Sequence, residues 1–244
     1  MDIDGLELAS RFSLPPNMRG YCGKPGLLPA FEKFYPDKTA DNARRLNAQL
    51  ETLPLMCTYL ETIAEANGID DKFSYENVEA FWIGNSLASK VTRDDAVRMY
   101  HNMAMKKIFP AKRAETLSNA LPKKIPPLHH SFHVYITEFV SKKAARTAAN
   151  KDKCRPSWGK AIGEGAGMLK VLSEPVIFSQ GQFSFAKATP VKLRHTVGKI
   201  RLVPKDPDIV AAHWGVAVKE ISLAEKSAMK KYTQSALDAA NRMQ

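Results

Sequence analysis

The hydrophobic pattern changes its period near residue 150, and this change limits the fold more than any other feature of the chain. Before it, apolar residues such as Leu46, Leu50 and Leu53 recur three or four positions apart, which predicts helices. After it come short β-type runs: Trp158–Ile162, Met168–Leu172, Val176–Phe178, Phe183–Phe185, Val191–His195, Ile200–Val203 and Ile209–Val218. Evenly spaced short strands with glycine turns are typical of a small barrel, whose closure leaves no open sheet edge. The sequence therefore predicts an α+β protein, with a helical domain at 1–150 and a β-barrel at 151–244.

Prolines and capping residues place the main breaks in this pattern. Five prolines between residues 10 and 36, including Pro15 and Pro16, predict an extended N-terminal segment, because proline resists helix interiors. Pro54 should kink or split the helix that starts near residue 41. The polar run Ser141–Asp152 marks the predicted domain boundary. Ser222-Leu-Ala-Glu225 is a capping box, so we expect an amphipathic helix at the end of the chain.

Composition indicates a soluble, cytoplasmic protein. The 244 residues are 44% hydrophobic and 25% charged, as in ordinary globular proteins. No apolar run approaches the roughly 20 residues that cross a bilayer, and the acidic start Met1-Asp-Ile-Asp-Gly does not resemble a secretory signal, so no membrane partner is expected. The three cysteines are Cys22, Cys57 and Cys154, and their wide spacing predicts free thiols. Cys57 lies on an apolar helical stripe, which favours a buried structural role.

The positive charge is concentrated in the C-terminal part of the chain. Residues 1–150 contain 20 basic and 17 acidic side chains, whereas residues 151–244 contain 16 and 8. A basic surface attracts nucleic acid, acidic proteins or anions. Because the chain has no aromatic RNP-like strand, GxxG loop or zinc finger, we expect an acidic protein or a small anion and no nucleic acid. The signatures GxSxG, P-loop and GxGxxG are also missing, which removes support for hydrolase, NTPase and dinucleotide-binding functions.

Cys154 and His213 form the main candidate metal site. One stands at the start of the run of strands and the other near its end, and the first and last strands of a small closed sheet tend to be neighbours. A thiolate and an imidazole together suit iron, zinc or copper. The cations Lys153 and Arg155 beside the thiol should lower its pKa and favour the thiolate that binds metal.

His129, His130 and His133 form a second candidate metal or polar site, with Cys22 as a possible neighbour. On a helix, residues 129 and 133 would lie one turn apart on the same face, and 130 and 133 would also be adjacent. Such HxxxH spacing can hold a metal. The alternative is structural: a buried polar network or a helix-start cap in which the imidazoles bond to backbone groups.

The C-terminal third resembles the small [NiFe]-hydrogenase maturation chaperones of the HypC/HybG type, which fold as an OB-like β-barrel with a C-terminal helix. The family's Cys-containing first motif corresponds to Cys154-Arg-Pro-Ser-Trp-Gly159-Lys-Ala-Ile. Its later His-containing strand corresponds to Asp206-Pro-Asp208-Ile-Val-Ala-Ala-His213-Trp-Gly215-Val-Ala217. The resemblance implies that Cys154 is an iron ligand. It also implies that His213 either is a weak ligand or contacts the ligands without binding the metal itself.

The same resemblance implies a function. Family members hold an Fe(CN)2CO fragment transiently, between the chaperone and the iron–sulfur protein HypD, and deliver it to the hydrogenase large subunit. The expected function is therefore that of a non-catalytic accessory protein in metallocentre assembly, with a HypD-like protein and the large subunit as partners. The alternative is a metalloenzyme with a site at His129, His130 and His133, which would make or modify a ligand of the metal cofactor. A third possibility is a basic binding module without metal.

The whole chain also resembles a domain-of-unknown-function family that is linked to hydrogenase gene clusters. Three stretches carry this likeness: Pro15-Pro-Asn-Met-Arg-Gly-Tyr-Cys-Gly23, Glu79-Ala-Phe-Trp-Ile-Gly-Asn85 and His129-His-Ser-Phe-His-Val134. The resemblance is long and specific but implies no assigned activity.

Overall fold

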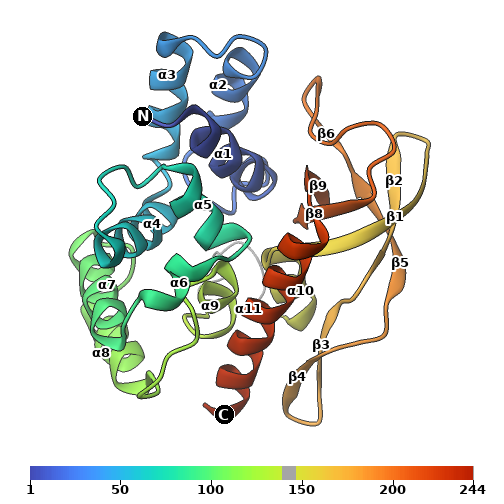
Figure 1. Cartoon of the computed structure of the whole chain (residues 1–244). Coiled ribbons are helices and arrows are strands. Elements are labelled where there is room, and N and C mark those ends of the chain that lie inside the picture. Colours follow the sequence, from blue (N-terminus) through green and yellow to red (C-terminus); the bar gives the residue numbers. More distant parts are fainter. Residues whose placement is uncertain (139–146, 244) are drawn as a thin grey trace.

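The computed structural model describes residues 1–138 and 147–243 and confirms an α+β protein with helices first, strands next and a helix last (Figure 1). No helix in these ranges is both long and apolar enough to cross a membrane. The helices are α1 (Ile3–Met18), α2 (Leu27–Phe34), α3 (Ala40–Leu50), α4 (Pro54–Asn67), α5 (Tyr75–Trp82), α6 (Ser86–Lys90), α7 (Arg93–Met105), α8 (Ala111–Ala120), α9 (His130–Tyr135), α10 (Ala148–Cys154) and α11 (Leu223–Arg242).

Helix breaks follow the local chemistry in most places. Pro54 stands at the first position of α4, where its missing N–H is harmless, so it separates α4 from α3 as predicted. Gly68 ends α4 in the left-handed conformation. The Ser222–Glu225 capping box is present at the start of α11, with both reciprocal hydrogen bonds formed.

The prediction of an extended segment over residues 10–36 is wrong. Helix α1 continues through Pro15 and Pro16, because proline disrupts only the carbonyls one turn earlier and both prolines lie in the last turn. Within residues 10–36, the backbone is irregular only at residues 19–26 and after the end of α2 at Phe34, and Gly20 and Gly23 adopt positive φ angles of 68° and 69°. Because Pro15 and Pro16 have no N–H, the backbone carbonyls of Arg11 and Phe12 in α1 have no helical donor.

Five strands close into a barrel in the order β1-β2-β5-β9-β8. The pairs are antiparallel except for a short parallel contact between β5 and β9, at Arg194 and Val216. Two hairpins, β3-β4 and β6-β7, extend from it. The strands are β1 (Ser157–Gly165), β2 (Met168–Ser173), β3 (Val176–Ser179), β4 (Gln182–Phe185), β5 (Thr189–Arg194), β6 (Thr196–Val197), β7 (Ile200–Arg201), β8 (Ile209–His213) and β9 (Val216–Glu220).

One predicted strand needs correction. The run Ile209–Val218 is not continuous but divides into β8 and β9, which pair with each other. The reversal occurs at Trp214 and Gly215, whose φ angles are 49° and 77°. A two-residue turn with positive φ at both positions matches the twist of a hairpin. Consequently His213 is the last residue of a strand and lies at the rim of the barrel.

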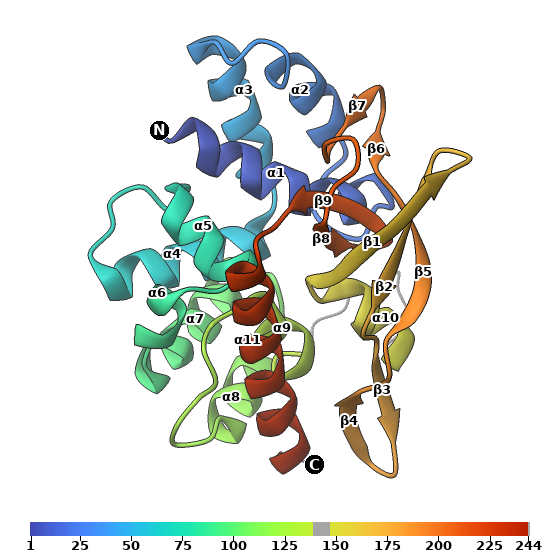
Figure 2. The ribbon, with the colours of Figure 1, turned by 45° about the vertical axis from the view of Figure 1, so that its right-hand side comes forward.

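The helical and β parts of the chain share one hydrophobic core. Its buried residues run from Leu6 in α1 to Ala240 in α11, and α1 packs against β8 and β9 while α11 packs against α9 and β4 (Figure 2). A smaller cluster fills the barrel interior, around Val171 and Val210. The predicted boundary at residue 150 falls within α10, and residues 141–146 of the polar run around it lie outside the described residues. The division into domains 1–150 and 151–244 therefore stays a prediction.

Gly84, which follows α5, packs closely against Tyr232 of α11. Its replacement by alanine should destabilise the protein strongly. Its φ is 100°, and a Cβ there would lie 2.2 Å from the Tyr232 ring, whose hydroxyl donates to the neighbouring Asn85 carbonyl. We expect Gly84→Ala to lower the free energy of unfolding by about 3 kcal/mol. Gly68→Ala is the control, because Gly68 also has positive φ but open space around it, and it should lose only about 1 kcal/mol. Equal losses in urea unfolding would contradict the packing argument.

Candidate metal centre

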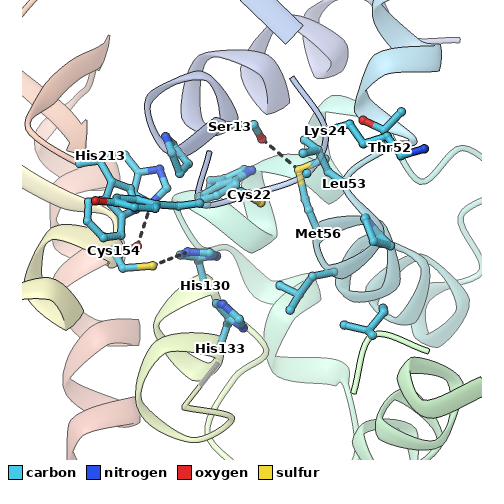
Figure 3. Close-up of a pocket in the computed structure, with 18 residues that line it drawn as sticks. Ser13, Cys22, Lys24, Thr52, Leu53, Met56, His130, His133, Cys154 and His213 are labelled. Carbon is cyan, nitrogen blue, oxygen red and sulfur yellow. Dashed lines mark hydrogen bonds between the residues drawn. The ribbon is translucent and has the colours of Figure 1, made fainter. Parts of the chain in front are cut away.

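Three side chains from distant parts of the sequence meet in one buried cluster. His130 comes from the start of α9, Cys154 from the end of α10 and His213 from the end of β8 (Figure 3). Their nitrogen and sulfur ligand atoms all lie within 4.8 Å of one another. The three residues are 6%, 8% and 2% exposed. The structure therefore joins the predicted Cys154–His213 pair to one member of the separately predicted histidine group.

The pairing of β1 with β8 brings Cys154 and His213 together. Ser157, just after Cys154, lies opposite Ala212, just before His213. The Trp214 N–H also donates to the Lys153 carbonyl at 2.9 Å, which fixes the end of α10 against the barrel rim. The expectation that two strands far apart in sequence would be neighbours is thus confirmed, although the partner of β1 is the penultimate strand.

Helix α1 orients the His213 ring through a carbonyl that a proline has freed. In a regular helix the Phe12 carbonyl would accept from the N–H of residue 16, but residue 16 is proline and has none. The Phe12 oxygen instead lies 2.6 Å from His213 Nδ1. His213 Nε2 faces a second carbonyl oxygen, that of Cys154, at 2.8 Å. A neutral ring has only one N–H and donates to only one of these two acceptors. When Nδ1 donates to Phe12, Nε2 carries the lone pair that a metal needs.

Two carbonyl oxygens compete for the single N–H of a neutral His213 ring. In the tautomer with the proton on Nδ1, no proton lies between Nε2 and the Cys154 oxygen 2.8 Å away, and a cation there would be stabilised by both atoms. Burial lowers the pKa of His213 to about 4, so the ring stays neutral at pH 7. A metal-bound histidine usually has its Nδ1–H held by a backbone carbonyl and its Nε2 on the metal; here a metal at Nε2 would replace the contact with the Cys154 carbonyl.

His130 completes the cluster from the helical side. Its ring packs at 4.3 Å from the Trp82 ring and edge-on to Phe81 at 5.0 Å. Its Nε2 lies 4.0 Å from the Cys154 sulfur, while its buried Nδ1 has no hydrogen-bond partner among the described residues. Burial, followed by the neighbouring histidines, lowers the pKa of His130 well below its usual value. The imidazole is thus neutral and available as a ligand.

The expectation of a depressed thiol pKa at Cys154 is wrong. Burial, with a smaller contribution from a charge on Cys22, raises the pKa of Cys154 to about 12. The adjacent Arg155 guanidinium is held elsewhere, by the Asp152 carboxylate at 2.8 Å and the Glu174 carbonyl at 2.7 Å. In the absence of metal the thiol is therefore protonated and inert, and metal binding has to release its proton.

His129 does not join the cluster, because it precedes the helix instead of lying on its face. It is the N-cap of α9, with φ −85° and ψ 162°, so the expected one-turn relation to His133 does not exist. Its Nδ1 accepts from the Ser131 N–H and its Nε2 donates to the Trp82 carbonyl at 3.1 Å. The structural alternative, a helix-start cap, applies to this residue.

His133 and Cys22 lie beside the cluster without belonging to it. His133 follows His130 along α9, with ring centroids 5.1 Å apart as the spacing predicts. Cys22 is half-buried on the segment between α1 and α2. Both line the same cavity as the three clustered residues but fall outside the group whose ligand atoms share the 4.8 Å limit. Cys57 is buried in the hydrophobic core, as predicted.

A cavity of about 370 Å³ adjoins the cluster. In Figure 3 the cluster occupies one end, and Met56, Leu53, Thr52 and Lys24 lie toward the other. Most of its wall is apolar, and besides the cluster the wall includes the end of α1, the start of α4 and the segments that precede α2 and α4. The side chains Trp82 and Trp214 flank it. The cluster is therefore accessible to a small molecule that passes through an apolar space.

A site with two imidazoles and one thiol suits a borderline or soft transition metal. Zinc, copper and iron accept two nitrogen donors and one sulfur donor, whereas magnesium and calcium require oxygen ligands. Donors on one tetrahedral ion lie about 3.5 Å apart, so the 4.0 Å separation of the Cys154 sulfur from His130 Nε2 has to contract slightly on binding. Three ligands leave one coordination position open.

Two groups that shape the site, the Phe12 carbonyl and the Trp82 side chain, cannot be identified from the sequence. The roles of the Phe12 carbonyl and of Trp82 depend on contacts across the fold, and only the Pro15-Pro16 pair within a helical stretch hints at a freed carbonyl.

Comparison with known proteins identifies a family but no function. A profile described as "Family of unknown function (DUF6390)" matches residues 1–244. No curated protein and no solved structure matches the chain.

Proposed function

The chain belongs to this family of unknown function, and we propose from its geometry that it binds one transition-metal ion through His130, Cys154 and His213. We further propose that it serves as an accessory protein that holds or transfers iron during [NiFe]-hydrogenase assembly. The observation that carries the proposal is the buried cluster itself. Three neutral donors from three separate elements converge within 4.8 Å, and a backbone carbonyl beside Nδ1 of His213 can hold that ring in the ligand tautomer.

The number of ligands favours a site that exchanges its cargo. Structural zinc sites are closed by four protein ligands, whereas sites that act on or transfer something keep a position open. Here the open position adjoins a cavity, so an iron fragment that already bears other ligands has space beside the protein donors. The iron is then cargo, and the protein contributes a thiolate and two imidazoles to hold it.

The arrangement of the barrel supports the finer part of the proposal. Cys154 precedes the first strand, His213 ends a neighbouring strand, and helix α11 follows the last strand. This is the order of elements in the HypC/HybG resemblance, and the ring of five strands with one parallel pair agrees with an OB-like barrel. On this proposal the partners are a HypD-like iron–sulfur protein and the hydrogenase large subunit. His213 acts as a direct ligand through Nε2, in the tautomer whose Nδ1–H donates to the Phe12 carbonyl.

Iron content after anaerobic co-production with hydrogenase maturation proteins tests the assembly role. The wild-type protein should retain about one iron per chain, and Cys154→Ala should lose it without loss of the fold. Cys57→Ala is the matched control, because that thiol is equally buried but lies in the hydrophobic core away from the cavity. Equal iron content in the wild type and Cys154→Ala would discard the assembly role.

A metalloenzyme is the second candidate, because the cavity offers a substrate space next to the open coordination position. The site of His129, His130 and His133 that the sequence suggested does not form, because His129 caps α9 and bonds to the Trp82 carbonyl. The enzyme would instead depend on His130 with His133. Metal that is lost on His130→Ala but kept on Cys154→Ala would favour this candidate over iron transfer by the thiol.

Replacing Pro16 should weaken metal binding although Pro16 carries no ligand atom. In Pro16→Ala the new N–H competes for the Phe12 carbonyl, which then holds His213 Nδ1 less firmly. We expect the affinity for Zn²⁺ to fall about tenfold in competition titrations with a chelating dye. Pro15→Ala is the control, because it restores a bond to the Arg11 carbonyl instead. Equal affinities for the two variants would contradict the role assigned to Phe12.

A further inference from the structure

The cavity beside the cluster contains almost no charge. Among its described lining residues Lys24 is the only charged side chain, and it is exposed; no carboxylate lines the space. The histidines bind as neutral rings, because a metal takes the lone pair that a protonated imidazole lacks. A bare divalent ion, without anionic ligands of its own, would therefore be balanced at His130, Cys154 and His213 only by the Cys154 thiolate, which leaves a net charge of +1.

An unbalanced charge in a buried apolar site is unfavourable. Desolvation penalises an isolated charge by several kcal/mol, and burial around these three ligands is nearly complete, with exposures of 2–8%. A single monoanionic ligand at the open position would make the site neutral. The electrostatics thus indicate an incoming anion more strongly than a neutral donor.

The shape and polarity of the cavity limit which anion it can be. Hydroxide would leave most of the roughly 370 Å³ empty. A carboxylate is a hard ligand that matches a soft site poorly and has a large desolvation penalty. A thiol reaches the site uncharged, and its body can occupy the apolar space beside Leu53, Leu55 and Met56. Its sulfur then supplies the soft negative ligand on coordination.

Trp82 provides an independent observation. This residue lines the cavity, is only 3% exposed and packs against both His130 and His213. Its indole Nε1–H is buried and has no acceptor in the described parts of the chain. A buried donor without a partner is costly, by about 1–3 kcal/mol. An anionic sulfur bound in the cavity beside the indole would supply the missing acceptor.

We propose that the metal-loaded site takes a small apolar thiol as its fourth ligand, bound as the thiolate inside this cavity. The inference rests on the proposed metal site. On binding, the S–H bond of the thiol breaks, a sulfur–metal bond forms with the sulfur electron pair, and the proton leaves to solvent. The oxidation state of the metal does not change. The thiol enters past Thr52 and Lys24, at the end of the cavity farthest from the cluster (Figure 3).

The test is a titration of the Co²⁺-loaded full-length protein with benzenethiol, followed by the sulfur-to-cobalt charge-transfer band. The band should gain intensity as a second sulfur binds. Benzenethiol should bind about tenfold more tightly than 2-mercaptoethanol, because its ring is buried in the apolar space. Benzenethiol that adds no sulfur band, or that binds no more tightly than 2-mercaptoethanol, would overturn the inference.

Two variants separate this inference from the metal site itself. Leu55→Trp should fill part of the cavity and weaken benzenethiol binding about tenfold, whereas the volume-conserving Leu55→Met should not. In the Co²⁺-loaded Trp82→Phe protein, loss of the indole N–H should also weaken benzenethiol about tenfold, so the test remains valid should Leu55→Trp fail to fold. Unchanged benzenethiol affinity in these variants contradicts the inference alone. Failure of the wild type to bind Co²⁺ contradicts the proposed function.

Discussion

Replacing Cys154 with serine is expected to lower the affinity of the protein for Co²⁺ and Zn²⁺ by about a thousandfold or more. Loss of a residue that merely supports a ligand already weakens metal binding by about 10–100-fold, and Cys154 is the only one of the three donors that becomes anionic on binding. Serine has nearly the same shape as cysteine, so the end of α10 should remain in place. The measurement is a competition titration of the metal-free protein against a chelating dye.

The two other cysteines serve as matched controls for this prediction. Cys22→Ser changes a thiol that lines the cavity outside the cluster, and Cys57→Ser changes one in the hydrophobic core. Cys22→Ser should shift the affinity far less than Cys154→Ser, and Cys57→Ser should not shift it at all. If Cys154→Ser binds Zn²⁺ as tightly as the wild type, the thiol is not a ligand.

The metal-free protein is expected to lose most of its stability between pH 6.5 and pH 4. Burial lowers the pKa of His129 and of His213 from 6.5 to about 4. Between these values the unfolded chain binds protons that the folded protein excludes, so the free energy of unfolding decreases as the pH falls. Each histidine contributes a loss of about 3 kcal/mol by pH 4. Two such losses approach the whole stability of a typical domain, about 5–15 kcal/mol.

Urea unfolding of the metal-free protein at a series of pH values measures this loss. His129→Asn should reduce the pH dependence, because asparagine can cap α9 without titrating. His101→Gln is the control, because it also removes one histidine, from an exposed position on α7. Stability that stays constant from pH 7 to pH 4.5 would show that these rings are not buried as neutral groups.

Local sequence patterns predicted most of the fold because they act over a few residues. Strand β1, the start of α4 at Pro54 and the capping box of α11 all follow from period, proline or capping chemistry. Helix α1 was missed because its packing against the barrel and α5 outweighs two prolines near its end. The reversal between β8 and β9 was missed because Trp214, a residue with strong strand preference, occupies a turn position.

The candidate site was predictable only in part, because its remaining features depend on tertiary contacts. The proximity of Cys154 and His213 followed from strand order, which the sequence conveys. The position of His130 beside Cys154 depends on how α9 packs against α10, and that contact cannot be predicted from local residue spacing. Similarly, neighbouring cations in sequence suggested a low thiol pKa, but Arg155 turns toward Asp152 and burial determines the result.

X-ray absorption spectroscopy of the protein loaded with one equivalent of Zn²⁺ tests the metal site most directly. In thiol-free buffer the account predicts one sulfur ligand at about 2.3 Å and two imidazole nitrogens at about 2.0 Å. Any fourth ligand should then be a light atom from solvent. A first shell with only nitrogen and oxygen ligands, or one without imidazole scattering, would contradict coordination by His130, Cys154 and His213.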